Sequence, residues 1–189
     1  MLFLKKQMGV IAVLAGLLVV TGCARMNRPS TVPTPDGAPP ADTARVYFVM
    51  PVVYPAGEVF VLHEQKLVGY LTNRQWFYMD VPAGKQMFMT VSENTTVVEG
   101  ELEGGKSYWV KNFVTPGFAK TRVYTAILQQ GTEDWDARKE WLSSSKHMEL
   151  VPESAAKWEA KYAKNNEKRQ QDYEAGKYEV LTFTATNVD

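Results

Sequence analysis

The fold is decided by residues 76–92, WFYMDVPAGKQMFMTVS, in which two apolar runs flank a short turn. Pro82-Ala83-Gly84 separates the runs, with Pro and Gly in the roles that they usually take in turns. In the second run, Met87, Met89 and Val91 alternate with their neighbours, and this period of two is typical of a half-buried β-strand. The stretch therefore predicts two consecutive strands, over 76–81 and 86–92.

Similar short runs continue on both sides of this stretch. Six more strands are predicted, at 45–50, 59–63, 67–71, 95–102, 107–114 and 122–128. Eight β-branched and aromatic runs about 10 residues apart indicate a sandwich or barrel of antiparallel strands. No helix-length segment separates them, so parallel βαβ units are not expected.

A subset of the strand residues is expected to form the core of this β-domain. The expected core residues are Val46, Phe48, Phe60, Leu62, Tyr78, Phe88, Val91, Tyr108, Val110, Val123 and Ile127. A domain of about 150 residues buries about 70% of its unfolded surface, which is enough to stabilise it without disulfides.

The order of strands and turns resembles one group of bacterial lipoproteins with a domain of unknown function similar to PEGA-type modules. The residues that carry the resemblance are 45–48, 59–71 and 78–91, with Val81-Pro82-Ala83-Gly84-Lys85 at the centre. The resemblance covers roughly Ala44 to Leu128. It implies an immunoglobulin-like or transthyretin-like antiparallel β-sandwich, and it implies no known activity.

The C-terminal third has a helical pattern. Thr132 to Leu142 is predicted to be a short helix capped by Thr132, and Pro152 begins a longer helix that ends near Gly176. Tyr178 to Thr186 is expected to add a final strand to a sheet edge. The predicted domains are therefore a β-sandwich over 44–130 and a C-terminal helical extension over 131–189.

The N-terminus has the pattern of an export signal. Lys5 and Lys6 precede the apolar run Met8 to Val20, which is shorter than the roughly 20 residues of a membrane-spanning helix. The run ends in Val20-Thr21-Gly22-Cys23, which resembles the lipobox of bacterial lipoproteins. The resemblance implies that residues 1–22 are a cleaved signal peptide and that Cys23 carries fatty acyl chains such as palmitate. Ala24 in the next position implies sorting to the outer membrane, facing the periplasm.

Residues 23–43 are expected to form a tether between the lipid and the folded domain. Five of the 20 residues from Ala24 to Thr43 are Pro, and the segment has no apolar periodicity. Such a composition does not bury enough surface to order a chain, so an extended, polyproline-like linker is predicted.

Composition excludes several classes of function. Lys and Arg total 21, as do Asp and Glu, so the neutral chain has no overall field to attract nucleic acid. One Cys and two His do not form a zinc-binding motif, and no cofactor or metal is expected. No nucleophile motif such as G-x-S-x-G is present, and no carboxylate pair is singled out by the sequence. The protein is accordingly predicted not to be an enzyme.

Trp76, Phe77 and Tyr78 are the candidate contact residues for a ligand or partner. Three consecutive aromatic residues on a strand cannot all face one core, because side chains alternate. If one face is exposed, it is suited to sugar stacking or to protein docking. In the other interpretation, which we favour, Trp158 and Tyr162 of the long helix cover them.

Taken together, the sequence predicts a non-catalytic lipoprotein that acts as an envelope accessory or interaction module. Its expected partners are the membrane, through Cys23, and an envelope protein or peptidoglycan. The alternatives left open are a glycan- or peptidoglycan-binding module that uses exposed aromatics, a carboxylate-based hydrolase, and a secretion-system lipoprotein of similar sandwich build.

Overall fold

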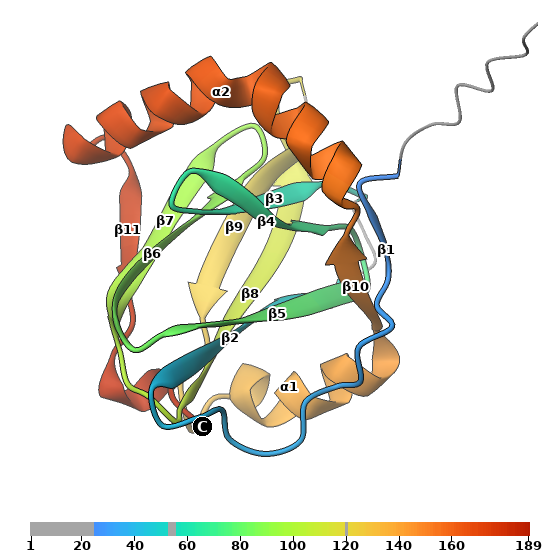
Figure 1. Ribbon diagram of the computed structural model, residues 1–189, viewed down its shortest axis with the longest axis vertical. Coiled ribbons are helices and arrows are strands. Elements are labelled where there is room, and N and C mark those ends of the chain that lie inside the picture. The colour runs from blue at the N-terminus through green and yellow to red at the C-terminus, as the bar shows by residue number, and fades with distance from the viewer. Residues whose placement is uncertain (1–24, 53–55, 120) are drawn as a thin grey trace, which may run out of the picture.

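The structure, a computed structural model, describes residues 25–52, 56–119 and 121–189. The described chain is mostly β, with two sheets and two helices (Figure 1). Cys23 and the predicted signal peptide lie outside the described residues.

The eleven strands form one sheet of six and one of five. In spatial order, the six-stranded sheet consists of β1 (Asn27–Pro29), β10 (Lys146–Leu150), β5 (Gln75–Pro82), β2 (Thr43–Met50), β8 (Ser107–Pro116) and β9 (Thr121–Ile127). The five-stranded sheet consists of β11 (Glu179–Thr182), β7 (Thr95–Leu102), β6 (Gly84–Val91), β3 (Val59–His63) and β4 (Lys66–Leu71). All eight predicted strands are confirmed, as β2 to β9.

The expectation of purely antiparallel pairing is wrong at three places. β2 pairs in parallel with β8, β5 with β10, and β7 with β11. The chain passes repeatedly from one sheet to the other: β2 is followed by β3 and β4 in the second sheet, and β5 by β6 and β7. These excursions replace the helical crossovers that parallel strands usually need, so parallel neighbours arise without a βαβ unit.

The expectation of an extended linker over 23–43 is wrong at residues 27–29, where the chain forms a strand of the body. β1 pairs antiparallel with β10, and Asn27 is buried. The Nδ2 group of Asn27 donates to the carbonyl of Tyr70 and to Oε1 of Gln75, at 2.8 and 3.0 Å. Residues 27–29 are therefore ordered by pairing with a strand far along the chain, which the composition of the segment did not indicate.

Both predicted helices are present. In α1 (Glu133–Ser144), the Thr132 hydroxyl accepts from the amide of Trp135, so the predicted N-cap is confirmed. The second helix, α2 (Pro152–Glu174), has Pro152 in its first turn and is followed by Gly176 with a φ of 67°. The predicted final strand is also confirmed, as the edge strand β11; a short 3₁₀ turn, η1 (Ala185–Asn187), follows it. Residues 131–189 thus contribute a strand to each sheet.

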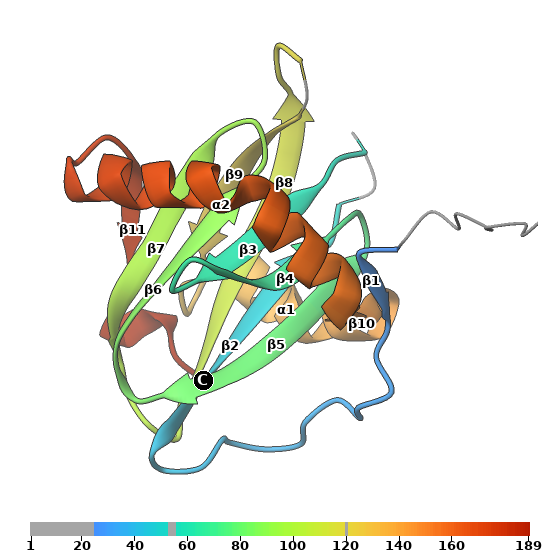
Figure 2. The same ribbon diagram turned by 45° about the horizontal axis from the view of Figure 1, so that its top comes forward.

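The main core lies between the two sheets, and each helix covers an outer face. Eight of the expected core residues are buried, while Phe60, Tyr78 and Ile127 are half-buried. Trp135 of α1 packs with Tyr47, Val49 and Trp109 of the six-stranded sheet. Trp158 of α2 packs on the five-stranded sheet, as Figure 2 lets the reader follow. Within the described residues, neither helix is both long and apolar enough to cross a membrane.

Candidate functional site

Trp76, the first of the three candidate aromatics, is a structural residue. Its side chain is 1% exposed and stacks on the imidazole of His147, with ring centroids 4.1 Å apart and planes 6° apart. Its Nε1 group donates to the carbonyl of Leu142, at the end of α1, at 3.1 Å. Trp76 therefore fastens β10 and α1 to the sheet and offers no surface for a ligand.

Phe77 points to the opposite face, as the alternation predicted, and lies in the main core. Its ring is 6% exposed and stacks on Phe48 with centroids 5.0 Å apart. The ring also rests directly on Gly69 of β4: a Cβ atom at that position would lie 1.9 Å from Cζ of Phe77. The absence of a side chain at Gly69 is thus what lets the two sheets approach here.

Tyr78 is the only one of the three that is half-buried. It shares a face with Trp76 and packs 5.9 Å from the ring of Tyr47. The guanidinium group of Arg45 lies 5.1 Å from the centre of its ring. Tyr78 remains the only member of the cluster with a substantial surface for contact.

The expectation that residues of the long helix cover these aromatics is wrong. Trp158 and Tyr162 of α2 lie on the other sheet, where Trp158 stacks on Phe60 at 5.0 Å. Trp76 is covered instead by β10 and the end of α1. No signal in the sequence identified β10 as a strand, so the true cover was not predicted.

A cavity of about 310 Å³ opens beside Tyr78, between the edge of the five-stranded sheet and β5 and β10. The segment after β1 passes over it, through Ser30 and Val32. The cavity is lined by Ser30, Val32, Val68, Gly69, Tyr70, Phe77, Tyr78, Met79, Asp80, His147, Met148, Glu149 and Leu150. We call it the seam cavity and take it as the candidate site, because it contains Tyr78, the one half-buried member of the aromatic cluster.

The charged groups of the seam cavity are already paired. Asp80 accepts two hydrogen bonds from Arg45, at 2.7 and 2.9 Å, and Glu149 accepts one from Arg28 at 2.7 Å. The hydrogen bond from Arg28 holds the pKa of Glu149 below its usual range. Both carboxylates are therefore engaged with arginine, which is not the arrangement of a general acid or base.

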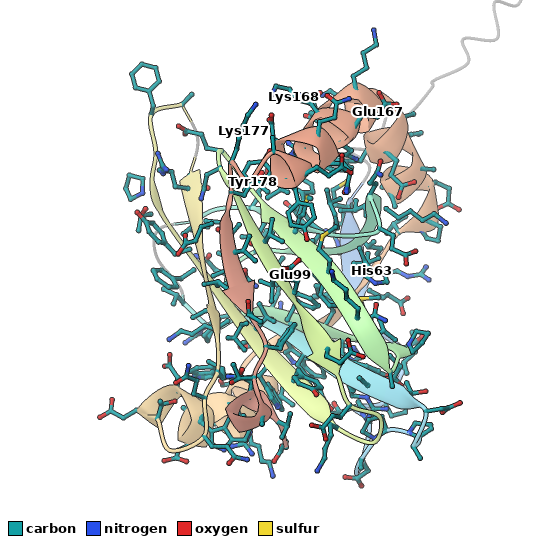
Figure 3. All side chains as sticks on the ribbon, turned by 90° about the vertical axis from the view of Figure 1, so that its left-hand side faces the viewer. His63, Glu99, Glu167, Lys168, Lys177 and Tyr178 are labelled. Carbon is teal, nitrogen blue, oxygen red and sulfur yellow. The ribbon has the colours of Figure 1, made fainter. Side chains whose placement is uncertain are left out.

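His147 is the one titratable imidazole of the cavity. Burial lowers its pKa from the ordinary 6.5, and a hydrogen bond with the main chain of Val32 acts in the opposite direction. The imidazole is therefore neutral at pH 7 and acts as a flat stacking partner for Trp76. The second histidine, His63, is bonded to Gln86 at 2.8 Å on the five-stranded sheet; Figure 3 labels it below α2.

Within residues 25–52, 56–119 and 121–189, no three His, Cys, Asp or Glu side chains are grouped to hold a metal ion. Tyr70, Tyr78 and Val32 give the seam cavity an apolar and aromatic part beside its paired carboxylates. They supply no activated nucleophile.

The N-terminal edge of the body is the other feature that bears on function. Met26 packs in the cluster around Trp158, and its carbonyl accepts from the amide of Val151, at the start of α2, at 3.0 Å. Met26, three residues after Cys23 in the sequence, is thus part of the folded body.

Comparisons with protein-family models, with curated proteins and with solved structures gave no match to this chain.

Proposed function

We propose that the protein is an outer-membrane lipoprotein, anchored through Cys23 and facing the periplasm, that acts as a non-catalytic interaction module of the envelope. The apolar run before Cys23 and the Val20-Thr21-Gly22-Cys23 motif support the anchor. The paired charges of the seam cavity favour a binding role over catalysis.

The observation that carries the proposal is the position of β1. Because Met26 and Asn27 are built into the body, only Ala24 and Arg25 lie between the acylated residue and folded structure. A chain extends at most about 3.6 Å per residue. Lipidation at Cys23 would therefore hold the body directly against the bilayer, where it is placed to dock with another envelope component.

The anchor is tested by intact-mass analysis of protein extracted from membranes. We expect a mass that corresponds to cleavage before Cys23 plus acyl chains, and release of these chains under lipolytic treatment. The matched control is Cys23→Ser, which lacks the sulfur acceptor and should carry no thioether-linked lipid. An unmodified thiol at residue 23 would overturn the anchor.

The role as an interaction module is tested by crosslinking the lipidated protein in intact envelopes. A defined protein partner is the expected result. Retention on purified peptidoglycan without a protein partner would favour the glycan-binding alternative. Burial of Trp76 and Phe77 leaves Tyr78 as the only one of the three candidate aromatics that could serve that alternative.

For the finer fold class, we propose an immunoglobulin-like or transthyretin-like sandwich, as the resemblance to PEGA-type modules implies. Two sheets packed around one core support this assignment, while the parallel β2–β8 pair departs from a purely antiparallel arrangement. An experimental structure superposed on members of both fold classes would test it.

A further inference from the structure

The charges of α2 are balanced in the sequence, and its exposed Glu153 lies one turn before Lys157, but the three lysines that follow occupy one side of the helix with no carboxylate between them on that side. Lys157, Lys161 and Lys164 are exposed and follow the i, i+4, i+7 spacing that places side chains along one side of a helix. The acidic residue among them, Glu159, turns inward and accepts from the amide of Leu67 at 2.8 Å. Within the described chain, none of the three ammonium groups pairs with a carboxylate. We call these residues the lysine strip.

The lysine strip borders the point where the described chain begins. Lys157 and Lys161 line the same surface hollow as Met26 and Trp158. Arg25 and Lys146 line the adjacent hollow, and both are exposed. Four basic side chains therefore border the place where Arg25 enters the body, together with Glu58, which lines both hollows.

A second feature lies at the same end of the molecule. The hairpin between β8 and β9 projects beyond the sheets at the end covered by α2, whereas α1 lies at the opposite end (Figures 1 and 2). At its tip, Phe118 is 101% exposed, the most exposed of the large apolar residues in the described chain.

The hairpin tip is held in place by the neighbouring turn. The Glu93 carboxylate accepts from the amides of Phe118 and Ala119, at 3.2 and 3.1 Å. The Ser92 hydroxyl donates to the carbonyl of Thr121 at 2.6 Å. These bonds hold the backbone of the tip, and the Phe118 ring lies in water, which is an unfavourable environment for it.

We propose that this end of the protein faces the bilayer: the lysine strip binds anionic phospholipid headgroups, and Phe118 enters the membrane interface. Lysines near an anionic surface are attracted by its potential, and aromatic rings favour the interfacial region. The inference rests on the proposed anchor at Cys23, because a short covalent link raises the effective concentration of the lipid surface at these residues. Two of the carboxylates nearby, Glu58 and Glu93, accept hydrogen bonds from Tyr70 and from the hairpin tip.

Single-site fluorophores on the mature, full-length protein test the orientation. Acylation consumes Cys23, so an introduced cysteine is the only free thiol. The probe is attached at Phe118→Cys, at Lys164→Cys or, as the control, at Lys139→Cys on the exposed surface of α1. The protein is reconstituted into vesicles of equal parts phosphatidylcholine and phosphatidylglycerol that contain a nitroxide-labelled lipid.

We expect the nitroxide to quench the probes at residues 118 and 164 but not the probe at residue 139. Replacing Lys157 by Ala should lower the ratio of docked to undocked protein about fivefold, while Lys139→Ala should leave it unchanged. Equal quenching at all three positions, or no quenching at 118 and 164, would contradict the proposal that this end of the protein faces the bilayer.

The outcome for the anchor is read separately, from the intact mass. If Cys23 is acylated but the probes at 118 and 164 stay in water, the proposed lipid anchor is supported and the proposed membrane-facing surface is contradicted. If Cys23 is unmodified, the proposed anchor fails, and the same full-length protein is mixed with the vesicles instead. Co-sedimentation that Lys157→Ala weakens would then support the surface, and absence of co-sedimentation would overturn it.

Discussion

Gly69 is the residue on which the spacing of the two sheets depends most directly. It lies in β4 against the ring of Phe77, and the nearest ring carbons would be 1.9 and 2.1 Å from an added Cβ. Phe77 cannot retreat easily, because its other face is stacked on Phe48. The close approach therefore depends on glycine for space and not for an unusual backbone angle.

Gly69→Ala should lower the free energy of unfolding by about 1–3 kcal/mol, the usual cost of overpacking a core. Urea denaturation followed by tryptophan fluorescence measures the change. The double variant Gly69→Ala with Phe77→Leu should recover part of the loss, because the smaller side chain relieves the clash. Additive losses in the double-mutant cycle would show that the two residues do not interact.

His147 gives stability a pH dependence whose sign follows from its environment. Burial lowers its pKa in the folded state below the 6.5 of the unfolded chain. The unfolded state therefore binds the proton first as the pH falls, and stability decreases on acidification below about pH 6.5.

His147→Phe keeps a flat ring on Trp76 but removes the titrating group. We expect the melting temperature of the wild type to fall more than that of His147→Phe between pH 7 and pH 5.5, in melts monitored by circular dichroism. Both proteins retain Glu149 and Arg28, so a parallel decline would mean that the carboxylates, and not the imidazole, dominate.

At the scale of elements, β1 is a three-residue strand with two very different side-chain anchors. Asn27 is buried and donates to Tyr70 and Gln75, while the neighbouring Arg28 makes an exposed ion pair with Glu149. Removing a buried donor leaves its acceptors unsatisfied, whereas an exposed ion pair contributes little.

Asn27→Ala should lower the free energy of unfolding by about 1–3 kcal/mol, and Arg28→Ala by less than about 1 kcal/mol. Limited proteolysis should cut the segment after β1 faster in Asn27→Ala than in Arg28→Ala. Equal cleavage rates in the two variants would mean that the ladder with β10, and not the Asn27 side chain, holds the segment.

The sequence identifies elements whose stability is encoded locally. β3 and β7 have the predicted bounds, because their apolar runs are bordered by turn residues. β1 and β10 were not predicted, because they are short, polar and stabilised by each other and by β5. The seam cavity was missed for the same reason: its walls come from β4, β5, β10 and the segment after β1, which no local pattern brings together.

At the scale of the whole molecule, the last described residues fasten α1 to the six-stranded sheet. The Asn187 side chain is 1% exposed and donates to the carbonyl of Leu128 at 2.9 Å. Asp189 pairs with Ser107 through the main chain and with Arg138 of α1 through its side chain, at 2.8 Å.

Asn187→Ala should therefore destabilise the fold by about 1–3 kcal/mol, because the buried hydrogen bond from the Asn187 side chain to the Leu128 carbonyl is lost. Differential scanning calorimetry measures the loss. The control is Asn165→Ala, at an exposed position of α2, which should change the transition by less than about 0.5 kcal/mol. Equal effects at the two sites would contradict a fastening role for the C-terminal turn.

The parallel pairing of β2 with β8 has a consequence for how the chain reaches its native state. Residues 45–49 of β2 pair with residues 107–111 of β8, and four strands of the five-stranded sheet lie between these two segments in the chain. Until β8 is present, β2 carries an unsatisfied backbone edge, and no amino-terminal fragment holds a complete sheet. An amino-terminal fragment that ends before β8 would therefore expose this edge to pairing with other chains, and both sheets are complete only once β9, β10 and β11 have been added.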